Sequence, residues 1–351
     1  MNKRIFIVAF FAFLFLAGSV YAAIGITELR TEQLKNPLGI DVRQPRLGWR
    51  IESDEQNVMQ TAYHILVASS ADLLAQGKGD IWDSGKIESD ASQWIAYQGK
   101  PLKRNARYYW KVKVYTNRGE ADWSAPAFWS MGLLNEADWQ GQWIGLDRAA
   151  SGDSETQWSR LAARYLRKEF ALSREVKRAT VHIAGMGLYE LFINGQRIGD
   201  QVLAPAPTDY RKTILYNTYD VTPQLRKENA IGVTLGNGRF YTMRQNYKPY
   251  KIPTFGYPKL RLNLIVEYMD GSKETIATNT SWKLTTEGAI RSNNEYDGEE
   301  YDARKELGNW TQSGYDDKSW IAAQRVSIPS GTLRAQIMPG MKVMDTLKPV
   351  S

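Results

Sequence analysis

The stretch NNEYDGEEYDARKELGNW, residues 293–310, holds the densest group of side chains that could do chemistry, with six carboxylates within residues 295–306. On an extended strand, Asp297 and Glu299 would point to one face about 7 Å apart. That distance falls within the carboxylate separation of an inverting glycosidase. However, any carboxylates at positions i and i+2 of a strand meet it, and two acids side by side cannot easily flank a scissile bond. We therefore do not expect a catalytic pair here.

The same stretch could instead bind a metal ion. Asn293, Glu295 and Asp297, followed by Gly298, match the start of a calcium loop with oxygen ligands at positions one, three and five. The twelfth position should be Glu and is Arg304, which excludes an EF-hand. Another calcium geometry stays open, because carboxylates and amides suit a hard cation. Its candidate ligands, which could equally line a contact between domains, are Asn294, Asp297, Glu299, Glu300 and Asp302.

A structural role is the interpretation that we favour for this stretch. Asp302 and Arg304 can form an ion pair or turn hydrogen bonds while Tyr296 and Tyr301 pack. In the following GYDDKSW, residues 314–320, the Asp side chains are expected to cap a turn and the Trp to close a sandwich. Acids that stay exposed could line a docking surface for a neighbouring domain.

A second candidate segment is LGNGRFYTMRQNYKPYKIPTFGYPKL, residues 235–260. Two glycines permit tight backbone turns around Asn237. Aromatic residues mixed with basic ones follow, and sugars bind by stacking on aromatic faces while polar side chains hold their hydroxyls. Arg239 and Tyr241 are therefore candidate carbohydrate ligands. The alternative is that three prolines stiffen a long connection against a sandwich.

Composition argues against several classes of function. The only histidines are His64 and His182 and the chain has no Cys, which leaves too little material for a zinc site or a Ser–His–Asp triad. We expect His182, in ATVHIAG, to lie on the solvent face of a strand. The formal net charge is +7, but the cations are scattered, so we expect no nucleic-acid groove.

The N-terminus predicts export. Lys3 and Arg4 precede thirteen apolar residues, 5–17, and the small residues of VYA, 20–22, suit a signal peptidase. This is the pattern of a signal peptide, residues 1–22, cleaved after Ala22. Thirteen apolar residues are too few to span a bilayer, so we expect no membrane insertion after cleavage. The protein is expected to be periplasmic or secreted.

The elements that must position the candidate residues are β-strands. Side chains alternate in TAYHILVAS, residues 61–69, and in ARYYWKVKVYT, residues 106–116, over the lengths of half-buried strands. Turn signals such as WDSGK, residues 82–86, separate them. Residues 23–135 therefore predict a fibronectin-type or immunoglobulin-like sandwich.

A second set of strands follows a linker at residues 136–160. Asn194-Gly195 and Asp270-Gly271 are hairpin signals within it. Residues 161–327 predict a larger sandwich, a jelly roll of the galactose-binding-like kind. Residues 328–351, with three prolines, are expected to be the loosely held start of an unfinished following domain. The predicted fold class is all-β.

The second domain resembles the N-terminal β-sandwich of bacterial α-L-rhamnosidases, glycoside hydrolase family 78. Three segments carry the resemblance: GLYELFINGQRIGDQVLAPAPTDYRKTILYNTYDVT (187–222), LGNGRFY (235–241) and NEYDGEEYDARKELGNWTQSGYDDKSW (294–320). The first domain, with LGWRI, WDSGK, YYWKVKVYT and ADWSAPAFW, is similar to the fibronectin-type module that precedes that sandwich. The resemblance covers nearly the whole chain after the signal peptide.

The resemblance implies hydrolysis of terminal α-L-rhamnose by a helical barrel that follows these domains. The chain ends at Ser351, so we expect the barrel to be absent from it and the chain to be inactive alone. Its implied partners are a rhamnose-containing glycan or glycoside and that barrel. The alternatives are a stand-alone carbohydrate-binding module or a structural docking fragment.

The resemblance also extends to a rhamnose-binding module of carbohydrate-binding family 67 that uses calcium. The nearest counterparts of its ligands are Asp200 in IGDQVLAP and Asn237 in LGNG. Calcium is the one cofactor that this resemblance suggests.

Overall fold

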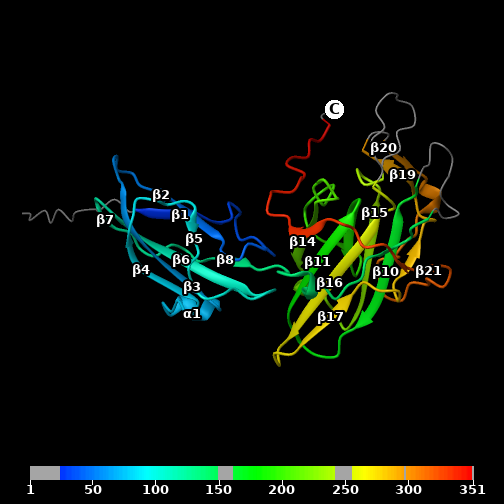
Figure 1. The fold of residues 1–351 in the computed structure, drawn as a ribbon, viewed down its shortest axis with the longest axis horizontal. Helices are drawn as coiled ribbons and strands as arrows, with labels where there is room; N and C mark the ends of the chain where they lie inside the picture. The colour runs from blue at the N-terminus through cyan, green and yellow to red at the C-terminus, as the bar shows by residue number, and fades with distance from the viewer. Residues whose placement is uncertain (1–23, 149–160, 242–254, 296–297, 350–351) are drawn as a thin grey trace, which may run out of the picture.

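The computed structural model describes residues 24–148, 161–241, 255–295 and 298–349, and these residues form two β-domains (Figure 1). The first domain runs from blue to cyan and the second from green to red. The prediction of an all-β chain with an immunoglobulin-like sandwich before a larger sandwich is confirmed. Of the described residues, none belongs to a helix long and apolar enough to cross a membrane.

The first domain packs two sheets face to face. In the described residues one sheet has the order β1-β2-β5 and the other β4-β3-β6-β7, with β8 also on β6. Alternate residues of β6 are buried, as the period-two pattern predicts. Trp49, Trp110 and Trp129 fill the space between the sheets. The strands are β1 (Gly25–Thr31), β2 (Arg46–Glu52), β3 (Gln60–Ala68), β4 (Trp82–Glu88), β5 (Ile95–Ala96), β6 (Arg107–Thr116), β7 (Gly119–Glu120) and β8 (Ala127–Ser130), with helix α1 (Ala71–Ala75) after β3.

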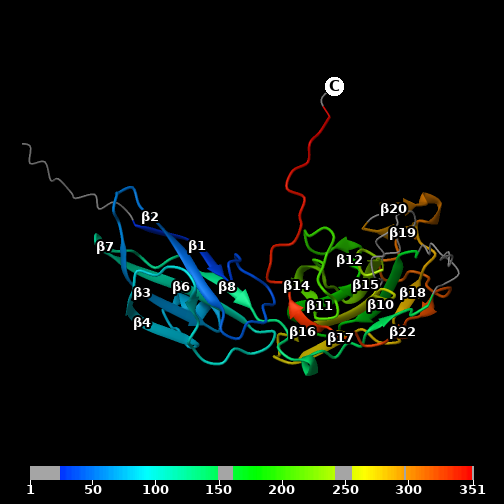
Figure 2. The same cartoon turned by 45° about the horizontal axis from the view of Figure 1, so that its top comes forward.

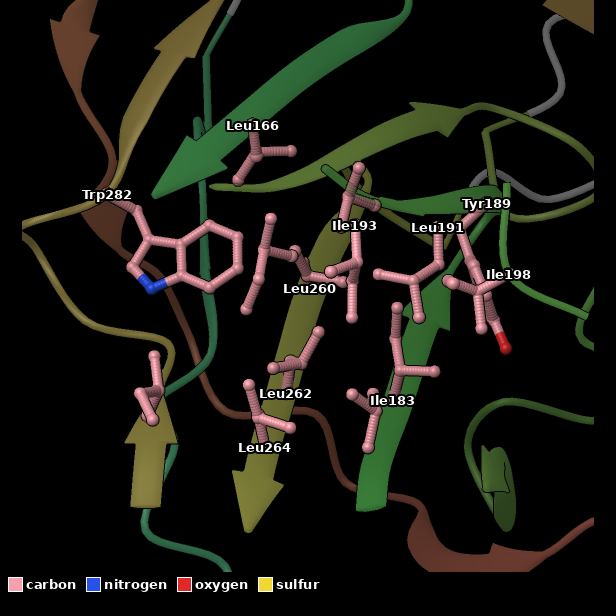
Figure 3. Packing of buried hydrophobic residues seen from close by; sticks show 14 of the residues in the cluster. Leu166, Ile183, Tyr189, Leu191, Ile193, Ile198, Leu260, Leu262, Leu264 and Trp282 are labelled. Carbon is pink, nitrogen blue, oxygen red and sulfur yellow. The ribbon is translucent and has the colours of Figure 1, made fainter. Parts of the chain in front are cut away.

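The second domain is a larger sandwich whose apolar core lies between two sheets (Figure 3). In the described residues the sheet orders are β13-β12-β15-β10-β18-β21 and β22-β9-β16-β11-β14-β23, with β17 on β16. Leu166 from one sheet and Ile183 and Leu262 from the other are fully buried there. The strands are β9 (Ile144–Gly145), β10 (Arg164–Ala171), β11 (Val176–Met186), β12 (Leu188–Ile193), β13 (Gln196–Arg197), β14 (Thr213–Asp220), β15 (Glu228–Gly236), β16 (Lys259–Tyr268), β17 (Lys273–Ala277), β18 (Lys283–Thr285), β21 (Ile321–Ala322), β22 (Gln324–Arg325) and β23 (Thr332–Ala335).

The structure differs from expectation at both ends of this domain. In the expected linker, Trp139 and Trp143 are buried and β9 pairs with β16 and β22. In the expected loose tail, β23 pairs in parallel with β14 and completes a sheet edge. The segment that follows β23 first lies against the second domain, where the Val202 N–H donates to the Met341 carbonyl at 2.9 Å and Gln201 forms a β-bridge with Lys342. Its end then leads away from both domains (Figures 1 and 2).

The two domains share a bonded interface. Tyr216 on β14 accepts a hydrogen bond at its hydroxyl from the backbone N–H of Leu133 and donates one to the carbonyl of Leu133, each at 3.2 Å. Gly39 of the first domain has φ +71° and lies so close to Thr218 that a Cβ would overlap that side chain. A glycine is required there by both backbone conformation and space.

His182 lies in this interface, which corrects the expected solvent-facing position. It is fully buried on β11, with Nδ1 2.9 Å from Thr218 Oγ1 and Nε2 3.1 Å from Asn105 Oδ1 of the first domain. Alternation had shown which residues of the strand share a face. It could not show that a second domain covers the outer face.

Candidate functional site

The acidic stretch forms a hairpin followed by a capped turn. Strand β19 (Ile290–Asn294) pairs antiparallel with β20 (Gly298–Tyr301), which sets Asn293 opposite Glu299 and Asn294 opposite Gly298. Glu299 and Glu300 are exposed on β20. Asp297 lies outside the described residues, so its side chain cannot be compared with that of Glu299.

Asp302 has the structural role that was predicted for it. It caps the 3-10 helix η3 (Ala303–Lys305) and accepts two hydrogen bonds of 2.8 Å from the guanidinium of Arg304. The bond from the Arg304 side chain lowers the pKa of Asp302 to about 2. A carboxyl group that is ionised at neutral pH cannot serve as a general acid.

The aromatic residues near this stretch are divided between core and surface. Trp320 is buried against Trp310 and Tyr315, as expected for a residue that closes the sandwich. Tyr301, which we expected to pack, is 52% exposed. The aromatic residues of the 310–320 segment therefore pack in a core cluster, whereas Tyr301 of the hairpin does not.

The described residues hold no cluster of acidic side chains for a calcium ion. Among them, no group of three or more His, Cys, Asp or Glu side chains is arranged to hold a metal ion. Asp200 is exposed and forms an ion pair of 2.5 Å with Lys342. Calcium binding stays a prediction, since Asp297 is not among the residues compared.

Asn237 is a structural residue of the turn after β15. Its backbone N–H donates to Asn293 Oδ1 at 2.6 Å, and its Nδ2 donates to the Leu161 carbonyl at 2.7 Å. Its own carbonyl accepts from the N–H groups of Phe240 and Tyr241. The side chain is buried, and its Oδ1 has no hydrogen-bond partner among the described residues, so sugar binding by Asn237 stays a prediction.

Tyr241 and Arg239 occupy different environments on this loop. Tyr241 is only 8% exposed and stacks on Tyr257 with ring centroids 5.7 Å apart. Arg239 is more exposed and its Nη1 lies 2.9 Å from Glu295 Oε1. The structure thus joins the loop to the acidic hairpin through Asn237–Asn293 and Arg239–Glu295, while Asp200 bonds elsewhere. Residues 242–254 lie outside the described residues.

A cleft of about 910 Å³ lies where the two domains meet. Arg107 of the first domain pairs with Asp220 of the second at 2.8 Å, and Glu267 lies 3.3–3.5 Å from three cations. Burial raises the pKa of both carboxyls, but the hydrogen bonds and cations around them outweigh it and lower each pKa. The Arg107–Asp220 pair links the two domains, whereas Glu267 pairs with cations of its own domain. Both carboxyls are held ionised, so neither is suited to act as a general acid. The charged lining residues are Asp72, Lys100, Lys103, Arg107, Lys177, Arg178, Asp220, Glu267 and Lys273.

Sequence reasoning missed this interface. Its polar residues come from separate strands and loops of both domains, and no spacing along the chain groups them. The one local signal was His182, a polar residue in an otherwise apolar strand, which is typical of a buried hydrogen-bonded side chain as well as of an exposed one.

The comparisons with known proteins agree with this architecture. Residues 26–135 match the model of the Rha78A-like N-terminal immunoglobulin domain, and residues 174–345 match that of the α-L-rhamnosidase N-terminal domain. An α-L-rhamnosidase of Formosa agariphila is 39% identical over 334 residues, which are 90% of this chain and 35% of the relative. The chain therefore spans about a third of the length of that relative.

Solved structures show the same likeness. The α-L-rhamnosidase of Dictyoglumus thermophilum is 39% identical, with a TM-score of 0.83 over 93% of this chain and 37% of that protein. The Streptomyces avermitilis α-L-rhamnosidase complexed with L-rhamnose is 25% identical, with a TM-score of 0.82 over 92% of this chain and 47% of that one. Two successive family domains and several relatives thus agree: the chain belongs to the α-L-rhamnosidase family and is the N-terminal portion of such a protein.

Proposed function

We propose that this chain is the exported β-region of a protein that hydrolyses terminal α-L-rhamnose from glycans or glycosides, and that it supports a catalytic part. The relatives named α-L-rhamnosidase are about three times as long as the matched region. In the described residues the carboxylates of the candidate segments cap turns, form ion pairs or lie on an exposed strand. The N-terminal signal pattern supports a periplasmic or secreted location.

The observation that carries this proposal is the apolar segment after β23. Met338, Met341, Val343, Met344 and Leu347 are all more than half exposed. Exposed apolar residues grouped in one segment are typical of a surface that another part of a protein covers. The relatives are about three times as long as the matched region. The part of an α-L-rhamnosidase that lies beyond its N-terminal domains is therefore the part that would cover this segment.

A chimera tests this function. The chain would replace the matched third of the Formosa agariphila relative, and hydrolysis of 4-nitrophenyl α-L-rhamnoside would be measured for the chain alone and for the chimera. We expect no turnover by the chain and clear turnover by the chimera. Replacing Met341 and Met344 with Asp should lower the chimera's melting temperature, whereas Met59→Asp, an exposed methionine of the first domain, should not.

Two results would contradict the proposal. The first is hydrolysis by the chain alone that is lost in Glu299→Gln. The second is a chimera in which the paired Asp substitutions at Met341 and Met344 change neither stability nor activity.

A rhamnose-binding module is the second candidate function. The contact between Arg239 and Glu295 supports it, because it brings an exposed guanidinium beside the acidic hairpin. Calorimetry with L-rhamnose, with and without a chelator, tests this function. Arg239→Ala should weaken binding, and no heat at millimolar sugar in either condition would reject the module.

A further inference from the structure

Trp94 differs from the other tryptophans of the chain. Its side chain is 53% exposed, and among the tryptophans of the described residues it alone falls in the exposed class. It precedes β5, the edge strand of the first domain's smaller sheet. Trp carries the largest apolar surface of any side chain, so leaving most of it in water forfeits a large part of its hydrophobic free energy.

The backbone of Trp94 is also in a conformation that bulky residues avoid. Its φ is +61°, in the left-handed region, where a large side chain is a genuine outlier. The chain on either side is held to β2, because Trp49 N–H donates to the Ser92 carbonyl and Tyr97 N–H donates to the Pro45 carbonyl, each at 2.9 Å. Such conformations persist where the surroundings over-determine them, and they cluster at sites that bind ligands.

The indole ring is supported from one side by an immobilised cation. The Arg46 guanidinium lies 4.4 Å from the ring centroid. It is held by Glu32, whose side chain is almost fully buried and whose Oε2 accepts from Arg46 Nη2 at 2.5 Å and from Nε at 3.2 Å. Glu32 Oε1 also accepts from the Arg46 backbone N–H at 2.7 Å. The guanidinium that lies over the ring is therefore held in place by a buried carboxylate.

We propose that Trp94 and Arg46 form a surface site that stacks a pyranose ring of a glycan. Sugar rings present a face of C–H groups that packs on an aromatic plane, while nearby polar groups bind the hydroxyls. The Arg46 guanidinium covers one face of the ring, so the sugar would stack on the other face and Arg46 supports the ring from behind. The assignment to a rhamnose-bearing glycan rests on the proposed function.

This site is separate from the segments considered above, since it lies on the first domain. It would hold the protein on a polymeric substrate rather than take part in bond cleavage. Hydrolysis of a small aryl rhamnoside by the chimera does not require it. Failure of the binding test and failure of the proposed function can therefore be told apart.

The test compares the whole chain with two variants by native gel electrophoresis through a neutral soluble polysaccharide that carries terminal α-L-rhamnose. Trp94→Asn removes the ring and places at this position a residue that tolerates positive φ, so the fold should keep its melting temperature. Tyr301→Ala is the matched control, because Tyr301 is an aromatic residue of similar exposure on the second domain. We expect the wild-type chain and Tyr301→Ala to be retarded equally, and Trp94→Asn to bind at least tenfold more weakly.

A second substitution tests whether Arg46 positions the Trp94 ring for binding or whether the ring only covers the Arg46–Glu32 pair. Arg46→Ala should weaken binding several-fold while Trp94 is still present, because the ring loses its support. Equal retardation of the wild-type chain and Trp94→Asn would overturn the inference, as would no retardation of the wild-type chain. A fall in the melting temperature of Trp94→Asn with unchanged retardation would show that the ring only covers the Arg46–Glu32 pair.

Discussion

Acid should loosen the contact between the two domains through His182. Burial, with a smaller contribution from Arg178, lowers the pKa of His182 to about 3. Nε2 faces the Asn105 oxygen and Nδ1 faces the Thr218 hydroxyl, so the neutral ring can donate to the first and accept from the second. The folded protein therefore keeps His182 neutral at pH 5 and above.

The size of the effect follows from the two pKa values. In the unfolded chain the histidine pKa is about 6.5. Above this pH neither state binds the proton and the shift has no effect on stability. As the pH falls below 6.5, the unfolded state takes up a proton that the folded state does not, so stability falls. At pH 5, which is about 1.5 units below the unfolded-state pKa, the free energy of unfolding is ~2 kcal/mol smaller than at neutral pH. This corresponds to a melting-temperature decrease of about 4–8 °C for a domain of this size.

Thermal unfolding between pH 5 and pH 7 measures this prediction. The control is His182→Gln, which keeps a donor and an acceptor but does not titrate. In this pH window most carboxylates are ionised in both states, so the difference in slope between the two proteins isolates His182. Identical pH dependence of the wild-type chain and His182→Gln would refute the reasoning.

Three further predictions follow from the described contacts. Arg167→Met should cost about 3–5 kcal/mol in urea unfolding, because the buried Arg167 guanidinium donates to two backbone carbonyls and pairs with Asp317; a cost below ~1 kcal/mol would contradict this. Gly39→Ala should lower the melting temperature more than Gly77→Ala, because both have positive φ but only Gly39 faces a neighbouring side chain; equal effects would count against the tight interface. A chelator should leave the melting temperature unchanged, because no group of three or more His, Cys, Asp or Glu side chains among the described residues could hold a metal ion; a decrease would point to other ligands.

Much of the fold could be predicted from the sequence because strands with one buried face alternate in a way that can be counted. The buried residues of β6 follow that pattern, and the Asn194-Gly195 turn adopts the positive φ angles that the dipeptide predicts. Strand β23 could not be predicted in the same way. Four residues near prolines carry no clear period, and their partner strand lies more than a hundred residues earlier.

The candidate site was predicted less well, because residue type alone does not report burial. Asn237 and Tyr241 have the chemistry of sugar ligands, and the structure shows that both are buried and make contacts within the fold, which the sequence did not indicate. Asp302 and Arg304 were predicted correctly, since neighbours along the chain bond locally and the spacing is sufficient. Trp94 was missed because its exposure depends on how its loop is held to β2.

The parallel pairing of β23 with β14 has a consequence for the order in which the protein can fold. Residues 332–335 leave a ribosome 119 positions after their partners at 213–216. At about 5–20 residues per second, the edge of β14 waits roughly 6–24 s for its neighbour. Ala335 also donates its N–H to Asp41 at 3.2 Å, so the first domain gains one of its contacts only after residue 335 has been made. During that interval β14 presents an unpaired strand edge, the kind of surface on which chains aggregate. An exported chain that stays unfolded until secretion is complete would avoid this delay, because both partners would then be present from the start.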